Sequence, residues 1–185
     1  MVQLNATRWV TDYSDTLYRY TLPRVKDSDA AKDLVQETFL AAWRNYEGFK
    51  GEISEKNWLF AILKNKIIDH YRKNARRITE SLPEEGAVDG FFDEAAHWTE
   101  SSSPLDWGID YSSAIEKKEF YAVLNNCKKK LKEIHNHVFT MKYMDGYDSD
   151  EICKELNITA SNYWVLIHRA KLHLRSCLEK NWFTN

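Results

Sequence analysis

The chain has 185 residues, enough for one sizeable hydrophobic core or two small ones, and its formal net charge of −2 is close to neutral. Six Gly and three Pro residues favour helices over a turn-rich β fold. Three widely spaced cysteines without a CxxC pair argue against a disulfide framework and are typical of a reducing cytoplasm. The N-terminus lacks a signal-peptide pattern and no apolar run approaches membrane-spanning length, so we expect a soluble, cytoplasmic protein without membrane insertion.

The near-neutral charge conceals an uneven distribution. Of the 28 acidic residues, nine lie in residues 79–113, which contain no Lys or Arg, so the rest of the chain carries 26 basic residues against 19 acidic ones. The same stretch has Gly, Pro and Ser clusters without periodicity, which predicts a linker that is at least partly extended or disordered. Two basic lobes joined by an acidic linker are expected of a nucleic-acid binder.

Two helices are predicted at the start of the chain. Residues 9–22 have helical spacing, and we expect this helix to end before Pro23, since the residue preceding a proline resists the α conformation. Asp27 or Ser28 then caps a second helix. Its predicted apolar stripe consists of Ala31, Leu34, Val35, Phe39, Ala42 and Trp43. Its opposite, polar face carries Asp33, Gln36 and Glu37, which on the residues alone indicate only solubility.

A glycine-containing loop precedes the third predicted helix. Gly48 and Gly51 flank Phe49 and Lys50, and two glycines permit positive φ angles and close backbone approach. Phe49 is either a plug tucked into the core or a stacking surface for a ligand, and the plug is the commoner case.

Residues 54–77 predict a long helix capped by Ser54, with an apolar stripe at Leu59, Ile62, Leu63 and Ile67. The remaining faces carry Trp58, Asn65, Tyr71, Lys64, Lys66, Arg72, Lys73, Arg76 and Arg77. Cations bind phosphates and aromatic rings stack on bases that have left a duplex, so this helix has the residue types needed to bind melted nucleic acid. The alternative is a solvated surface helix with a basic C-terminal end.

After the acidic linker, helical order is predicted to return at Ser113, which has capping-box spacing to Glu116. An apolar stripe follows at Phe120, Val123, Leu124, Cys127 and Leu131. A further helix is expected from about Leu131 to Met144. Its His135 and His137 are two residues apart, which on a helix separates their side chains, so core or surface histidines are favoured over a metal site.

Residues 148–178 have the pattern of a helix-turn-helix. Asp148 and Glu151 have capping-box spacing for a short helix to Leu156, Asn157 suits the left-handed conformation that ends it, and Thr159 caps a longer helix. The predicted buried face of this helix is Tyr163, Ile167, Ala170 and Leu174. Its outer face is Ser161, Asn162, Trp164, Val165, His168, Arg169, Lys171 and Arg175, which in a helix-turn-helix enters a DNA major groove. A plain helical hairpin remains an alternative.

Three segments in this order resemble bacterial sigma factors of the extracytoplasmic-function (ECF) group of the sigma-70 family. DLVQETFLAAW (33–43) is similar to that family's core-polymerase-binding motif, FKGEIS followed by NWLFAILKNKIIDHYRK (49–73) to its promoter-melting segment, and residues 137–175 to its C-terminal helix-turn-helix. The resemblance implies an all-α protein with two small helical domains. Their expected bounds are 5–78 for sigma region 2, 79–113 for the acidic linker and 114–185 for sigma region 4.

The resemblance also implies partners and roles for individual residues. Core RNA polymerase would be contacted by Asp33, Gln36 and Glu37. The minus-ten element would be bound by Phe49, Lys50, Trp58, Asn65, Arg72, Lys73, Arg76 and Arg77. Of these, Phe49, Lys50 and Asn65 would help to form a pocket for a flipped base. The four cations from Arg72 to Arg77 would hold the phosphate backbone. The minus-thirty-five element would be read by Ser161, Asn162, Trp164, Val165, His168, Arg169 and Lys171. An anti-sigma factor that clamps both lobes is a further expected partner.

Two other functions account for the sequence less well than a sigma factor does. A stand-alone helix-turn-helix regulator gives no account of residues 33–73. An enzyme is not expected, because the sequence has no phosphate-cradling glycine loop, nucleophile elbow or convincing metal cluster, and no cofactor or metal is implied.

Overall fold

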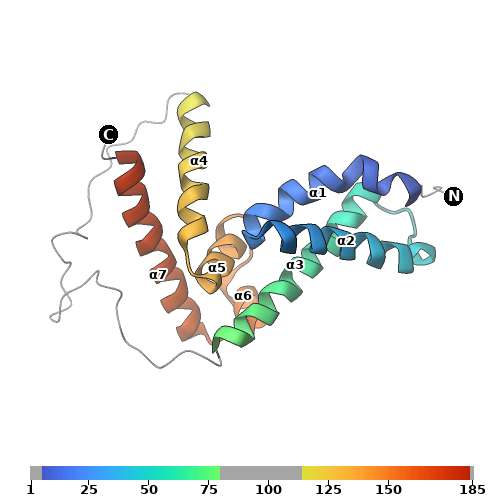
Figure 1. The fold of residues 1–185 in the computed structure, drawn as a ribbon. Helices are drawn as coiled ribbons and strands as arrows, with labels where there is room; N and C mark the ends of the chain where they lie inside the picture. Colours follow the sequence, from blue (N-terminus) through green and yellow to red (C-terminus); the bar gives the residue numbers. More distant parts are fainter. Residues whose placement is uncertain (1–5, 80–113, 184–185) are drawn as a thin grey trace. The chain divides into compact units, whose positions relative to one another are not determined.

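The computed structural model describes residues 6–79 and 114–183, so the expected linker lies outside the described residues from residue 80 to residue 113. The described part is all helical (Figure 1). Its α-helices are α1 (Trp9–Val25), α2 (Ser28–Arg44), α3 (Glu55–Thr79), α4 (Ala114–Lys130), α5 (Glu133–Tyr143), α6 (Ser149–Leu156) and α7 (Ala160–Leu178). Short helical turns occupy Ala6–Arg8, Tyr46–Gly48 and Glu179–Phe183. The chain divides into two compact units, and the prediction of two helical domains is confirmed.

In the first unit, α1 and α2 lie side by side and α3 completes the core (Figure 1). The apolar stripes that face inward include Leu17, Ala31, Ala42, Leu59 and Leu63, which are completely buried. Burial of one stripe from each helix is the main source of stability for so small a unit, because isolated helices of this length are marginal in water.

The prediction that α1 ends before Pro23 is wrong. The helix continues to Val25, and Lys26 ends it in a left-handed conformation with φ 64° and an N–H bond to the carbonyl of Leu22. Pro23 removes one backbone donor, but Arg24 ties the last turn back by donating from Nη1 to the carbonyl of Tyr20 over 2.7 Å. Tertiary packing against α2 therefore overrides the local preference of the proline.

Two aromatic residues of the first unit lie where the sequence did not place them. Tyr71, expected on an open face of α3, is fully buried, and its hydroxyl donates to the carbonyl of Arg24 over 3.2 Å. Trp43, expected in the apolar stripe of α2, is 63% exposed. Tyr71 therefore belongs to the core and Trp43 to the surface.

In the second unit, α4 and α7 lie alongside each other and α5 packs against α7 (Figure 1). The predicted stripe of α4 is confirmed: Cys127 and Leu131 pack with Ala170, Leu174 and Leu178 of α7 in one buried cluster. His135 and His137 are buried residues of α5, as expected of core histidines. The predicted cap pair of Ser113 and Glu116 falls outside the residues whose side chains are described.

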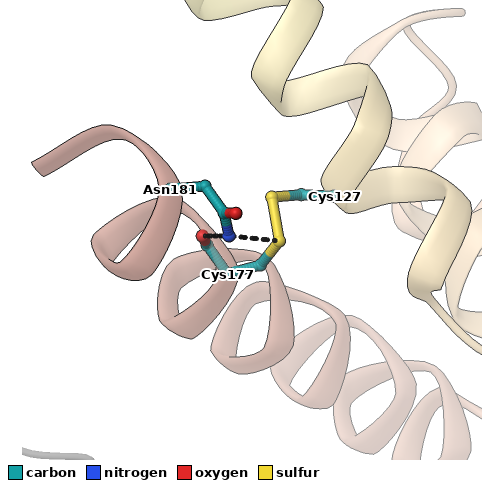
Figure 2. The surroundings of a disulfide bond; sticks show 3 residues. All are labelled: Cys127, Cys177 and Asn181. Atoms are coloured by element: carbon teal, nitrogen blue, oxygen red, sulfur yellow. Dashed lines mark hydrogen bonds between the residues drawn. A yellow bond between two sulfur atoms is a disulfide. The ribbon is translucent and has the colours of Figure 1, made fainter. Parts of the chain in front are cut away.

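The sequence-based expectation about the cysteines is wrong for two of the three. Cys127 of α4 and Cys177 of α7 form a disulfide that joins positions 50 residues apart, while Cys153 is a free thiol (Figure 2). Both half-cystines sit in the seam between α4 and α7, so the packing of the two helices brings them together. In the chain-entropy model, closing a loop of this length stabilises the folded state by about 4 kcal/mol.

The start of α2 is fixed by Asp27, one of the two caps that the sequence predicted as alternatives. The backbone N–H groups of Asp29 and Ala30 donate to Asp27 Oδ1 over 2.8 and 2.7 Å. These two bonds hold the pKa of Asp27 below its ordinary value of 3.8, because they stabilise the charged carboxylate. The bond from the Ala30 N–H has the larger effect on this pKa.

The Asp27 cap predicts a specific acid sensitivity. Since the folded-state pKa is lowered, the contribution of the charged cap is present above the ordinary pKa of 3.8 and is lost as the pH falls through the lowered folded-state value. Asp27→Asn keeps an acceptor oxygen but cannot titrate, so its melting temperature should fall less than that of the wild type between about pH 5 and pH 2. Parallel pH profiles of the two proteins would contradict this, and Asp27→Ala should be less stable throughout.

Candidate functional site

The exposed side of α2 combines polar and large apolar side chains. Asp33, Gln36 and Glu37 are exposed, as predicted. Leu40 and Trp43, which are 57% and 63% exposed, follow at helical spacing on the same side of the helix. The buried stripe lies on the opposite side. We call the residues Asp33, Gln36, Glu37, Leu40 and Trp43 the α2 face.

Sequence reasoning found only the polar half of the α2 face. The predicted apolar stripe leaves out Leu40, and it places Trp43 in the core because Trp43 continues the apolar spacing of Phe39 and Ala42. A signal was available, since Leu40 lies seven residues after Asp33 and therefore on the same side of a helix. Exposed Leu and Trp side chains next to polar ones are typical of a protein-binding surface.

An ion pair links the α2 face to α3. Lys66 Nζ lies 3.1 Å from Glu37 Oε2, and both side chains are partly exposed to solvent. Such a pair contributes little stability because water screens it, but it orients the Glu37 carboxylate across two helices.

The loop before α3 is held against the core by aromatic rings that pack in tilted and edge-on contacts. The Phe49 ring lies 4.8 Å from that of Trp58, and Trp58 meets the buried Trp9 edge-on at 5.9 Å, measured between centroids. Phe49 and Trp58 are each half-buried, so both anchor the loop and still present part of a ring to solvent. The neighbouring Lys50 is exposed. The packing of Phe49 on Trp58 fits the plug alternative, while part of its ring remains open to solvent.

One side of α3 is continuous with this aromatic cluster. The spacing of Trp58, Asn65 and Arg72 puts them on the same side of the helix, opposite the buried stripe of Leu59, Leu63 and Ile67. Asn65 and Lys73 are exposed, and Arg72 Nη1 donates to Asp69 Oδ1 over 2.9 Å. Arg76 and Arg77 lie in the last turns of α3, where side chains are not described. The start of α3 has the predicted Ser54 cap, which accepts from the Asn57 N–H.

The helix-turn-helix elements form as the sequence predicted. The Asp148 N–H donates to Glu151 Oε2 and the Glu151 N–H donates to Asp148 Oδ1, each over 2.8 Å, which completes the capping box of α6. Asn157 has φ 53°, the left-handed conformation that ends the helix. Thr159 Oγ1 accepts from the Asn162 N–H and starts α7. These local bonds fix the turn between α6 and α7.

The first turns of α7 present the residues predicted to read DNA. Six of them are exposed and Arg169 is half-buried; the exposed ones are Ser161, Asn162, Trp164, Val165, His168 and Lys171. Trp164 is 62% exposed and its ring lies 5.2 Å from that of the buried Tyr163. Tyr163, Ile167, Ala170 and Leu174 are buried, as predicted.

An exposed tyrosine of α5 extends this surface and was missed from the sequence. Tyr143 is 52% exposed, and Lys171 Nζ lies 5.5 Å from the centroid of its ring. A cation over an aromatic face is attractive, so Tyr143 helps to place the Lys171 ammonium group. Only the packing of α5 against α7 makes this neighbour visible.

No helix among residues 6–79 and 114–183 has both the length and the apolar character needed to cross a membrane.

Comparison with known proteins assigns the two units to one family. Residues 9–77 match the model of Sigma-70 region 2, and residues 122–174 match the model of Sigma-70, region 4. A probable RNA polymerase sigma factor of Haemophilus influenzae is 38% identical over 85% of this chain and 81% of its own length. The ECF RNA polymerase sigma factor SigX of Bacillus subtilis is 27% identical over 90% of this chain and 80% of its own length.

A solved structure of the sigma factor RpoE from Bartonella quintana in complex with the anti-sigma factor NepR is 18% identical, with a TM-score of 0.44 over 95% of this chain and 97% of that chain. The matches to region 2 and region 4, together with the relative that is 38% identical, establish the family. The chain is an ECF-group member of the sigma-70 family, which binds core RNA polymerase and promoter DNA and directs the initiation of transcription.

Proposed function

We propose a division of this work between the two units. Residues 5–78 bind core polymerase and open the minus-ten element, residues 114–185 read the minus-thirty-five element as duplex, and residues 79–113 link them. The observation that carries the proposal is the exposure, in both units, of large side chains on the helix side opposite the core, as at Trp43 and Trp164. The protein acts in the cytoplasm, without catalysing a reaction of its own.

The α2 face is the proposed docking surface for core polymerase. Its polar residues, Asp33, Gln36 and Glu37, are open to solvent, and the Glu37 carboxylate is oriented by Lys66. Leu40 and Trp43 supply apolar area that water contacts in the free protein. Release of that water on binding supplies affinity, and the polar rim supplies orientation.

The variant with Asp33, Gln36 and Glu37 all changed to alanine should bind core polymerase roughly tenfold or more weakly, because it loses the polar contacts of the α2 face. The measurement is co-elution with core polymerase on size exclusion, followed by titration. The matched control changes Asp12, Asp15 and Thr16 of α1 to alanine, which removes the same charge from another exposed helix side. Equal binding by the two variants would contradict the assignment.

The side of α3 that starts at Trp58 is the proposed site for the melted minus-ten strand. The half-buried rings of Phe49 and Trp58 offer a stacking edge that is already ordered by Trp9, and Lys50 places a cation beside it. Asn65 lies two turns further along α3 and can bond a base edge, while the cations Arg72, Lys73, Arg76 and Arg77 follow toward the helix end. Capture of an unstacked base favours strand opening by mass action, since the site binds only the open form.

Asn65→Ala should reduce strand opening about tenfold while leaving binding to core polymerase unchanged, because Asn65 is exposed and the contact of α3 with Glu37 of the α2 face is made by Lys66. Permanganate reactivity of unpaired thymines in promoter DNA measures opening directly. Asn125→Ala is the control, since Asn125 is an exposed asparagine of α4, in the second unit. Full opening by Asn65→Ala would remove Asn65 from the base pocket.

The first turns of α7 are the proposed reader of the minus-thirty-five duplex. Ser161, Asn162 and Val165 lie nearest the start of the helix, which in a helix-turn-helix enters the major groove. Trp164 and His168 add area beside them, and Arg169 and Lys171 provide cations for the phosphates.

For the complex with core polymerase and promoter duplex, the binding constant falls as salt rises. Arg169→Ala and Lys171→Ala should each make the negative slope of log binding constant against log salt concentration shallower by about 1. Each change removes one cation from a phosphate contact, so affinity falls similarly for all promoter sequences. Lys118→Ala, an exposed lysine of α4, is the control. An unchanged salt slope for both α7 variants would exclude them from the phosphate contacts.

An anti-sigma factor is a proposed further partner. It would clamp both units and cover the α2 face, which otherwise remains open to polymerase. Transcription that is unaffected by a co-expressed inhibitor encoded next to this protein would count against the proposal. A stand-alone regulator is not favoured, because region 2 matches over residues 9–77.

A further inference from the structure

The disulfide of the second unit lies at the junction of its two longest helices. Cys127 of α4 and Cys177 of α7 have Cα atoms 5.7 Å apart (Figure 2). Cys127 belongs to the buried cluster with Leu131, Leu174 and Leu178, and Cys177 packs against that cluster. The bond joins the last turns of α7 to α4, while the first turns of α7 carry the proposed DNA-reading residues. The bond therefore acts on the helix that reads DNA without occupying its reading surface.

The two sulfur-bearing residues differ in accessibility. Cys127 is 2% exposed, whereas Cys177 is half-buried. An open cavity of ≈ 260 Å³ lies against the bond, and both cysteines line it. A small molecule that enters the cavity therefore meets Cys177 more readily than Cys127.

The wall of this cavity is basic. Lys130 of α4, His173 of α7 and Lys180 of the following turn all line it, and no carboxylate is among its lining residues. Asn181 Nδ2 donates to the Cys177 carbonyl over 2.6 Å and lies 3.6 Å from Cys177 Sγ, so an amide donor also faces the sulfur (Figure 2). Positive charge and hydrogen-bond donors near a sulfur favour its thiolate form, which is the reactive form in thiol–disulfide exchange.

We propose that Cys127 and Cys177 are a reversible redox pair, oxidised by a peroxide and reduced by an anionic low-molecular-weight thiol that enters the basic cavity. A disulfide in a protein that works in a reducing cytoplasm is typically transient or redox-sensing rather than permanent. In this respect the inference rests on the proposed cytoplasmic site of action.

Oxidation proceeds in two steps. The Cys177 thiolate attacks one oxygen of hydrogen peroxide, the O–O bond breaks, and the hydroxide that leaves takes up a proton, which gives a sulfenic acid on Cys177 and one water. Cys127 sulfur then attacks the sulfenic sulfur and loses its proton, and hydroxide leaves with that proton as a second water. Two thiols and one peroxide thus give one disulfide and two waters.

Reduction reverses this with two equivalents of thiol. The thiolate of the small thiol attacks Cys177 Sγ, the more accessible sulfur, and the Cys127 thiolate leaves and takes up a proton. A second small thiolate attacks the small-thiol sulfur of the mixed disulfide and releases Cys177. The products are two protein thiols and the disulfide of the small thiol.

Cys153 is an internal reference for these reactions. Burial, followed by the charge of Asp150, raises the pKa of its thiol, which lowers its thiolate fraction. It is a free thiol in the same unit as the pair. Cys153→Ser should therefore change neither oxidation nor reduction of the pair.

The first test counts the titratable thiols and measures the melting temperature of the full chain in its oxidised and reduced states. After peroxide and acid quench, the denatured chain should have one titratable thiol, and after millimolar glutathione it should have three; Cys153→Ser should give none and two. Reduction should lower the melting temperature of the second unit by roughly 15–30 °C, because it restores the freedom of the unfolded chain. The shift should be absent in Cys127→Ser/Cys177→Ser.

The second test separates a basic entry site from a merely accessible bond. Lys130→Glu/Lys180→Glu should slow reduction by glutathione about three- to tenfold while changing the rate with uncharged 2-mercaptoethanol by less than about twofold. Lys117→Glu/Lys118→Glu, the same charge change at exposed lysines elsewhere on α4, should leave both rates unchanged.

Three results would overturn the proposal. The first is a cysteine pair that stays reduced after peroxide. The second is a disulfide that persists in millimolar glutathione, as a permanent cross-link would. The third is an equal effect of Lys130→Glu/Lys180→Glu on the rates of reduction by glutathione and by 2-mercaptoethanol. None of these measurements uses polymerase or DNA, so failure of the redox pair and failure of the proposed promoter contacts are seen separately.

Discussion

Burial of one stripe along each helix is the interaction on which the rest of this structure depends. Leu59, Leu63 and Ile67 of α3 are in the core, and their helical spacing leaves Trp58 and Asn65 on the other side. The same relation holds in α7, where burial of Tyr163, Ile167 and Ala170 presents Trp164 and Val165 to solvent. The core therefore determines which side chains are available to a partner, and a substitution in it would turn or loosen a binding surface without touching it.

Features that depend on a few neighbouring residues were predictable from the sequence. The Asp27 cap, the Asp148–Glu151 capping box and the left-handed Asn157 all form between groups within three residues of each other, and each formed as expected. The apolar stripes of α3, α4 and α7 were also found, because the helical period is strong in all three. The order of the motifs along the chain was enough to indicate the family, which the comparisons confirm.

The features that were missed depend on contacts between distant residues. Pro23 stays in α1 because the helix packs against α2. The hydroxyl of Tyr71 can be buried because it donates to the carbonyl of Arg24, 47 residues away. Trp43 fits either side of the helix by its chemistry, and only the position of the neighbouring elements leaves it exposed. The Cys127–Cys177 bond joins residues 50 apart, and no cysteine spacing motif signals it.

The surfaces proposed to bind polymerase and DNA require little reorganisation of the residues that carry them. Phe49 packs against Trp58 and Trp58 meets Trp9 edge-on, so the rings proposed to meet a flipped base are ordered before DNA arrives. Lys171 lies over Tyr143, and Glu37 pairs with Lys66, which limits the conformations of both charged groups in the free protein. Groups that are ordered in advance lose less entropy on binding, which favours affinity and selectivity for the correct partner.

Hydroxyl-radical footprinting of the full chain tests the central claim, that the two units use their exposed helix sides for different partners. Trp43 and Trp164 are well suited as reporters, because they are 63% and 62% exposed and their indole rings react readily when they are open to water. Core polymerase alone should protect Trp43, and protection of Trp164 should require promoter DNA with a minus-thirty-five element. A Trp43 that stays fully reactive in the polymerase complex, or a Trp164 that promoter DNA leaves unprotected, would contradict the account.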